Sequence, residues 1–136
     1  MKRFALICFL LLTGISLCFS QKSWDLKTFP KGSTPEEVGL RIAERYLRSS
    51  HSANGVPDTG VAPRQVIYPD VCTWLGSMWF AEQTGNDELF NKLKLRFEPL
   101  FTEEKKLQPK PVHVDNNVFG SLPFELYMRT KEKRYL

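Results

Sequence analysis

The stretch YPDVCTWLGSMWFAEQTGNDELFNKLKLRFEPLF, residues 68–101, determines the fold class. In residues 68–85, apolar side chains cover most of a helix circumference, which predicts a helix packed on several sides. Gly85 stands where a helix commonly ends in a left-handed residue. In residues 86–101, apolar side chains recur at helical spacing on one face and polar ones on the other. The stretch therefore predicts a helical hairpin with an apolar inner helix and a half-solvated outer helix.

Another helix is predicted before this hairpin, over residues 34–48. Thr34 is a good N-cap, Pro35 suits the first helical position, and Glu37 completes a capping box. Apolar side chains then recur every four residues on one face, at Val38, Ile42 and Tyr46.

The hairpin pattern returns after a period of about 45 residues. Residues 74–90 (WLGSMWFAEQTGNDELF) align with residues 118–136 (VFGSLPFELYMRTKEKRYL) with a two-residue gap. A period of this length, built from helix, tight turn and helix, is typical of a helical-hairpin array. Gly76 and Gly120 predict close approach of a neighbour to each inner helix, and Pro123 predicts a kink. The expected fold is therefore all-α.

The N-terminal residues 1–20 are expected to be a secretory signal peptide, because a positive start precedes a short apolar run. Cleavage would fall before Gln21; a lipid anchor on Cys18 is the alternative. Removal of the signal lowers the net charge from +4 to +2 and leaves no basic stripe with interleaved aromatics. We therefore expect no nucleic-acid binding and no membrane association of the mature chain. Residues 21–33 are predicted to be an extended leader and residues 34–136 the folded domain.

Few residues offer reactive or metal-binding chemistry. Signal cleavage would leave Cys72 as the one cysteine, and its apolar, Trp-rich neighbourhood predicts a buried packing thiol rather than a nucleophile. No Gly-rich phosphate loop, G-x-S-x-G or H-E-x-x-H motif is present, so no cofactor is expected. His113 and Asp115 alone are too few ligands for a metal site. His51 lies in a Ser-, Gly- and Pro-rich loop over residues 49–66, where a solvated histidine is the default and a site role the alternative.

A polar and aromatic segment precedes each inner helix: QVIYPD before the first, PVHVDNN before the second. In a hairpin array both segments lie on one rim, which would gather Tyr68, Asp70, His113, Asp115, Asn116 and Asn117. An aromatic ring beside carboxylates and amides suits a sugar. The alternative is that Asp70 and Asp115 are simply helix caps, a position that aspartate favours. Trp79 is expected in the core, whereas Trp74 fits either the core or the rim.

Four segments resemble a known family: YPDVCTWLG, the TGNDELF turn, HVDNNVFGSLPFELY and TKEKRYL. They are similar to the unsaturated glucuronyl and rhamnogalacturonyl hydrolases of glycoside hydrolase families 88 and 105. The resemblance covers residues 35–136 and is sharpest over residues 113–136. The order of the segments and the 47-residue step from Tyr68 to Asp115 make it specific. It implies an (α/α)6 barrel of six hairpins, with the site at one end of the inner helices.

The resemblance also implies a reaction. These enzymes act on oligosaccharides with a terminal unsaturated uronic acid: a proton adds at C4, water adds at C5, and the hemiketal falls apart. Asp115 matches an aspartate that assists catalysis and binds the sugar, and Tyr68 matches a substrate-contacting aromatic. From position, His113, Asn117 and Trp74 are further substrate contacts.

The general acid and base aspartate of the family has no counterpart among these 136 residues. Because the family's catalytic domains run to several hundred residues, we expect this chain to be an N-terminal portion that is inactive alone. A non-catalytic, secreted helical-repeat module that binds glycan or protein is the alternative.

Overall fold

The computed structural model describes residues 28–52 and 60–136. The predicted signal peptide and the leader before residue 28 lie outside the described residues. The chain divides into two units, residues 1–30 and 31–136, and all the helices described below belong to the second. Within the described residues every regular element is an α-helix or a 3₁₀ helix, which confirms the all-α prediction.

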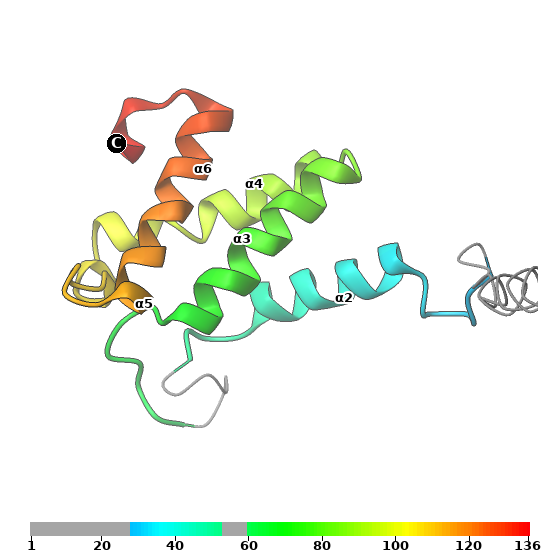
Figure 1. Ribbon diagram of the computed structural model, residues 1–136, viewed down its shortest axis with the longest axis horizontal. Coiled ribbons are helices and arrows are strands. Elements are labelled where there is room, and N and C mark those ends of the chain that lie inside the picture. The colour runs from blue at the N-terminus through cyan, green and yellow to red at the C-terminus, as the bar shows by residue number, and fades with distance from the viewer. Residues whose placement is uncertain (1–27, 53–59) are drawn as a thin grey trace, which may run out of the picture. The chain divides into compact units, whose positions relative to one another are not determined.

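The α-helices are α2 (Pro35–Arg48), α3 (Tyr68–Gln83), α4 (Asp87–Leu95), α5 (Val114–Asn117) and α6 (Ser121–Thr130) (Figure 1). The 3₁₀ helices are η2 (Glu98–Phe101), η3 (Lys105–Leu107), η4 (Val118–Gly120) and η5 (Lys133–Tyr135).

Helix α2 begins with the predicted capping box. The Thr34 hydroxyl accepts the Glu37 N–H at 3.1 Å, and the Glu37 carboxylate accepts the Thr34 N–H at 3.1 Å. The backbone and side-chain hydrogen bonds from Thr34 lower the pKa of Glu37. Two of the otherwise unpaired N–H groups at the helix start are thereby satisfied.

Helices α3 and α4 form the predicted hairpin and lie side by side (Figure 1). Gly85 has φ +63°, and the N–H groups of Gly85 and Asn86 donate to the carbonyls of Glu82 and Ala81 in a Schellman motif. Asn86 then caps α4 by accepting the Leu89 N–H at 3.0 Å. Near the other end of the pair, the Trp74 indole N–H donates to the Leu93 carbonyl at 3.0 Å, so the two helices run antiparallel.

The predicted outer helix is shorter than expected. Residues 86–101 were expected to form one helix, but α4 ends at Leu95 and the chain continues as 3₁₀ helix η2. Pro99 has no N–H to donate to the Leu95 carbonyl, which explains the break. The apolar side chains Phe97 and Leu100 are nevertheless buried, 2% and 0% exposed.

The end of α6 repeats the turn at the end of α3. Lys131 has φ +59°, which matches Gly85, and the Thr84 and Thr130 hydroxyls each donate at 2.8 Å to the carbonyl four residues earlier. The two inner helices are also tied at both ends, by Gln65–Asn116 and by Glu82–Arg129, so α3 and α6 run parallel. The internal repeat inferred from the sequence thus has a structural counterpart.

Lys131 adopts a left-handed conformation that is costly for a residue with a side chain. We therefore expect Lys131→Gly to raise the free energy of unfolding by roughly 0.5–1 kcal/mol, because relief of this strain exceeds the added entropy of the unfolded chain. The loss of the weak contact between the Lys131 ammonium and the Tyr127 ring, 5.6 Å from its centroid, offsets little of this gain. Urea denaturation checks the result. Thr130→Gly, at a helical position, should instead destabilise, and equal effects of both glycines would contradict the assignment.

Pro123 lies in the first turn of α6, and the preceding 3₁₀ helix η4 separates it from α5. The chain changes helix type just before the proline, whose ring would meet the Phe119 carbonyl in a regular α-helix; the kink itself stays a prediction.

The core lies between the inner helices and their neighbours. Fully buried side chains come from α3 (Trp74, Met78), α4 (Leu93) and α6 (Leu122, Leu126). The loop after α2 joins this core at two points. The Ser52 N–H donates to the Asp70 carboxylate at 2.9 Å, and the Val66 N–H donates to the Leu107 carbonyl at 2.7 Å.

The predicted close approach at Gly76 and Gly120 is wrong: a Cβ atom added at either residue would meet nothing within 4 Å among the described residues. The close approach occurs at Gly39 instead, where an added Cβ atom would clash with the ring of Phe80. A larger residue at this position would therefore displace the Phe80 ring where α2 packs on α3.

Candidate functional site

The N-terminal ends of α3 and α5 lie next to each other, as Figure 1 shows. The Gln65 side-chain amide donates to Asn116 Oδ1 at 2.9 Å, and the Asn116 amide donates to the Lys110 carbonyl at 2.9 Å. Asn116 therefore joins the segments that precede the two inner helices. The proximity expected of these segments is observed.

Asp115 is exposed at this rim, with 63% of its side chain accessible. It does not cap α5: the N-cap residue is His113, whose Nδ1 accepts the Asp115 N–H at 3.2 Å. The same Nδ1 lies 3.5 Å from the Asp115 carboxylate. The interpretation of Asp115 as a helix cap is thus wrong, and the carboxylate faces solvent beside the imidazole.

Tyr68 is the first residue of α3 and is half exposed. A hydrogen bond to the Cys72 side chain, one turn later, raises the pKa of Tyr68, and the charge of Asp115 acts in the same direction. Tyr68 therefore lies near enough to Asp115 for the carboxylate charge to act on its phenol. Cys72 itself is exposed, so the prediction of a buried thiol is wrong; Cys72 lies on the outward side of α3.

Asp70 is buried, 8% exposed, and is not a helix cap either, since the N-cap of α3 is Ile67. Its carboxylate accepts the Ser52 N–H and lies 3.6 Å from Nδ1 of His51. Asp70 therefore holds the loop after α2 and does not join the exposed rim.

Trp74 lies in the core and not at the rim. Its side chain is 0% exposed, it packs against Tyr46 and Phe97, and its indole N–H is used by Leu93. The prediction that Trp74 contacts substrate is not supported by this burial. Trp79 was expected in the core, and this prediction is wrong because its side chain is 50% exposed. Asn117, the last residue of α5, is exposed at the same end of the molecule as Asp115.

A second polar cluster surrounds His51, which is buried and not the solvated loop histidine that was expected. This residue is 6% exposed, and its ring nitrogens lie 3.6 Å from the Asp70 carboxylate and 3.7 Å from that of Glu104. Arg96, expected on the solvated face of the outer helix, instead donates to the Ser49 carbonyl at 2.8 Å. The Arg96 guanidinium lies 4.3 Å from the Tyr46 ring centroid. A loop histidine and a helix arginine carry no local signal that they will meet, so sequence spacing could not reveal this cluster.

Burial raises the pKa of Tyr46 above its ordinary value of 10.0, against a smaller opposing effect of Arg96. A folded-state pKa above the unfolded one gives stability that is complete below about pH 10 and is lost as the pH rises towards the folded value. We expect the free energy of unfolding to fall above pH 10, and Tyr46→Phe to reduce that fall. Urea denaturation at about pH 8 and about pH 11 checks this. The variant would contradict the assignment if it kept the full alkaline loss.

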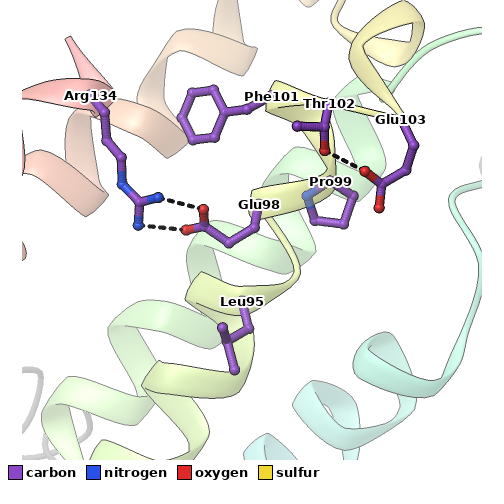
Figure 2. Close-up of a pocket in the computed structure, with 7 residues that line it drawn as sticks. All are labelled: Leu95, Glu98, Pro99, Phe101, Thr102, Glu103 and Arg134. Atoms are coloured by element: carbon purple, nitrogen blue, oxygen red, sulfur yellow. Dashed lines mark hydrogen bonds and ion pairs between the residues drawn. The ribbon is translucent and has the colours of Figure 1, made fainter.

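A cavity of about 510 Å³ lies elsewhere, between η2 and the C-terminal segment (Figure 2). Figure 2 shows the Arg134 guanidinium against both oxygens of Glu98, at 2.7 and 2.9 Å. The Tyr135 hydroxyl also donates to Glu98, at 2.7 Å. These polar groups satisfy one another, so this cavity carries an ion pair that holds the chain together rather than groups poised for a ligand.

No family model, no curated protein and no solved structure matches the chain. Within the part of the chain that the structure describes, no three metal-binding side chains come together. Over those same residues, no helix combines the length and the apolar character needed to span a bilayer.

Proposed function

We propose that residues 34–136 belong to a glycoside hydrolase of the unsaturated glucuronyl or rhamnogalacturonyl type, built on an (α/α)6 barrel. Its substrates are oligosaccharides that carry a terminal uronic acid with a C4=C5 double bond. One observation carries the proposal: the exposed Asp115 carboxylate lies in α5, just before the inner helix α6, and its charge acts on Tyr68 at the head of the inner helix α3. The repeat predicts that the two residues share a rim, the resemblance gives each a role in binding sugar, and the parallel course of α3 and α6 supports the arrangement.

In this proposal Asp115 and Tyr68 have different roles. The carboxylate of Asp115 accepts hydrogen bonds from sugar hydroxyls and assists the addition of water at C5. The half-exposed ring of Tyr68 stacks on the apolar face of the sugar.

His113 and Asn117 complete the substrate contacts. Because Nδ1 of His113 accepts the Asp115 N–H, the neutral imidazole carries its proton on Nε2, and this nitrogen donates to the substrate. Asn117 offers an amide group from the last residue of α5. Trp74 has no part in this scheme because it is buried. Export by the signal peptide, with cleavage before Gln21, would place the protein in the periplasm or outside the cell.

The test is a binding titration of the 136-residue chain with an unsaturated galacturonyl-rhamnose disaccharide, followed by amide NMR. We expect the shifts to centre on Tyr68, His113, Asp115 and Asn117. Tyr68→Ala should weaken binding about tenfold, because it removes the aromatic ring that packs on the sugar. Trp79→Ala, an exposed aromatic outside the site, is the matched control. Shifts spread over the surface, or unaltered by Tyr68→Ala, would contradict the proposal.

A second test separates chemistry from stability. In an enzyme that contains these residues, Asp115→Asn should lower turnover by about 10²–10⁴-fold, the usual contribution of a carboxylate engaged in proton transfer. Because Asp115 is not a helix cap, the unfolding free energy of the Asp115→Asn variant should stay within about 0.5 kcal/mol of that of the unchanged protein. The 136-residue chain alone is expected to leave the ultraviolet absorbance of the substrate double bond unchanged.

A non-catalytic module that binds protein is the second candidate. It is favoured by large apolar side chains exposed on three helices, Ile42 of α2, Trp79 of α3 and Phe124 of α6, each at least 50% accessible. Turnover of the unsaturated disaccharide by an enzyme containing these residues, and its loss in Asp115→Asn, would exclude this candidate.

A further inference from the structure

Another cavity, of about 350 Å³, does not include Tyr68 or Asp115 in its lining. Its polar lining comes from Ser50, His51, Arg96 and Glu104, and its apolar lining from Pro63, Pro99 and Leu107. The volume lies within the range of about 300–1,000 Å³ found for small-molecule sites. The proposed function does not use these residues.

The His51 ring is held in a fixed orientation. Its side chain is 5% exposed, and its two nitrogens face the carboxylates of Asp70 and Glu104. The indole of Trp74 packs against the ring, with centroids 5.8 Å apart. Nδ1 has no hydrogen-bond partner among the described residues. The Nε2 atom of the imidazole lies 3.7 Å from the carboxylate of Glu104, and both residues line the cavity.

The guanidinium of Arg96 is fixed as well. One Nη group donates to the Ser49 carbonyl at 2.8 Å and the other to the Leu47 carbonyl at 3.4 Å. The guanidinium has five N–H donors, and its Nε has no hydrogen-bond partner among the described residues, so Arg96 keeps donor capacity at the cavity lining. The side chain of Glu104 is 38% exposed, and its ionised carboxylate can accept hydrogen bonds but cannot donate them. The cavity thus combines fixed donors with a carboxylate acceptor.

The charges select against an anion. The lining carries one arginine, Arg96, and one glutamate, Glu104, and the carboxylate of Asp70 adds a negative charge next to His51. A hydroxyl group both donates and accepts, so a pair of hydroxyls matches an arginine and a carboxylate on one wall. The proline and leucine side chains offer an apolar surface to the C–H face of a ring. We propose that this cavity binds one neutral sugar ring through Arg96, Glu104 and His51, at a position independent of Asp115.

The experiment is an amide NMR titration of the full chain with methyl β-D-glucoside, with sodium acetate as the anionic comparison. We expect saturable shifts with the glucoside at His51, Arg96 and Glu104, and none there with acetate. Glu104→Ala should weaken binding at least tenfold. Glu103→Ala, the adjacent carboxylate on the lining of the other cavity, is the matched control and should leave binding unchanged.

Three results would overturn the proposal: no saturable shift with the glucoside, a stronger response to acetate, or equal binding by Glu104→Ala and Glu103→Ala. Thermal unfolding of each variant establishes that it is folded. Asp115→Asn should bind the glucoside as the unchanged chain does. Binding of the glucoside by this variant tests the cavity alone, whereas the unsaturated disaccharide tests the proposed hydrolase site, so the two proposals can fail separately.

Discussion

Replacement of Trp74 by alanine is expected to lower the free energy of unfolding by about 3–5 kcal/mol, the usual cost of truncating a fully buried aromatic side chain. The Trp74 ring is 0% exposed and packs against Tyr46 of α2 and Phe97 after α4, so one truncation opens a cavity among several elements. It also leaves the Leu93 carbonyl without its indole donor. Urea denaturation followed by circular dichroism measures the loss.

Trp79 provides the matched control because it lies on the same helix and is 50% exposed. Trp79→Ala should change the unfolding free energy by no more than about 1 kcal/mol. If Trp74→Ala does not fold, Trp74→Phe keeps most of the ring volume and should cost about 1–2 kcal/mol through the lost hydrogen bond. Similar losses for the two alanine variants would contradict the assignment of Trp74 to the core.

Replacement of Arg96 by alanine is expected to cost about 2–4 kcal/mol. Arg96 donates to carbonyls at the C-terminal end of α2, where a positive charge also complements the helix dipole. Hydrogen bonds from a charged group contribute about 1.5–3 kcal/mol, and the guanidinium over the Tyr46 ring adds about 1 kcal/mol. The loss should appear as a lower urea midpoint.

Arg48→Ala is the control for Arg96, because Arg48 belongs to α2 itself and 72% of its side chain is exposed. Its pair with Glu44, at 3.6 Å, is a surface interaction and should contribute under about 0.5 kcal/mol. An equal loss in Arg48→Ala and Arg96→Ala would show that α2 depends on general surface charge and not on the hydrogen bonds from Arg96 to the end of the helix.

The helices were predictable because local signals and tertiary contacts agree there. The capping box at Thr34 and the turn at Gly85 act within a few residues, so sequence spacing is sufficient to locate them. The repeat was predictable for the same reason, since Thr84 and Thr130 make the same local hydrogen bond. The break at Leu95 was missed because the apolar spacing continues through Pro99 although the backbone hydrogen bonds do not.

The candidate site was predictable only in part. The meeting of Tyr68 and Asp115 follows from the repeat, which places both at the heads of parallel helices. Which tryptophan is buried does not follow, because α3 is apolar on most sides and only its packing partners decide between Trp74 and Trp79. Asp70 was mistaken for a helix cap because residue preference cannot show that a loop eighteen residues earlier will occupy its carboxylate.

The two attachments of the loop after α2 have a consequence for engineering and for natural variation in length. Because Ser52 is held by Asp70 and Val66 by Leu107, the chain between them enters and leaves the fold at fixed points. Doubling the length of such a loop costs only about 0.6 kcal/mol in closure entropy. A peptide tag or a fluorescent reporter inserted between these two residues should therefore leave the helices folded.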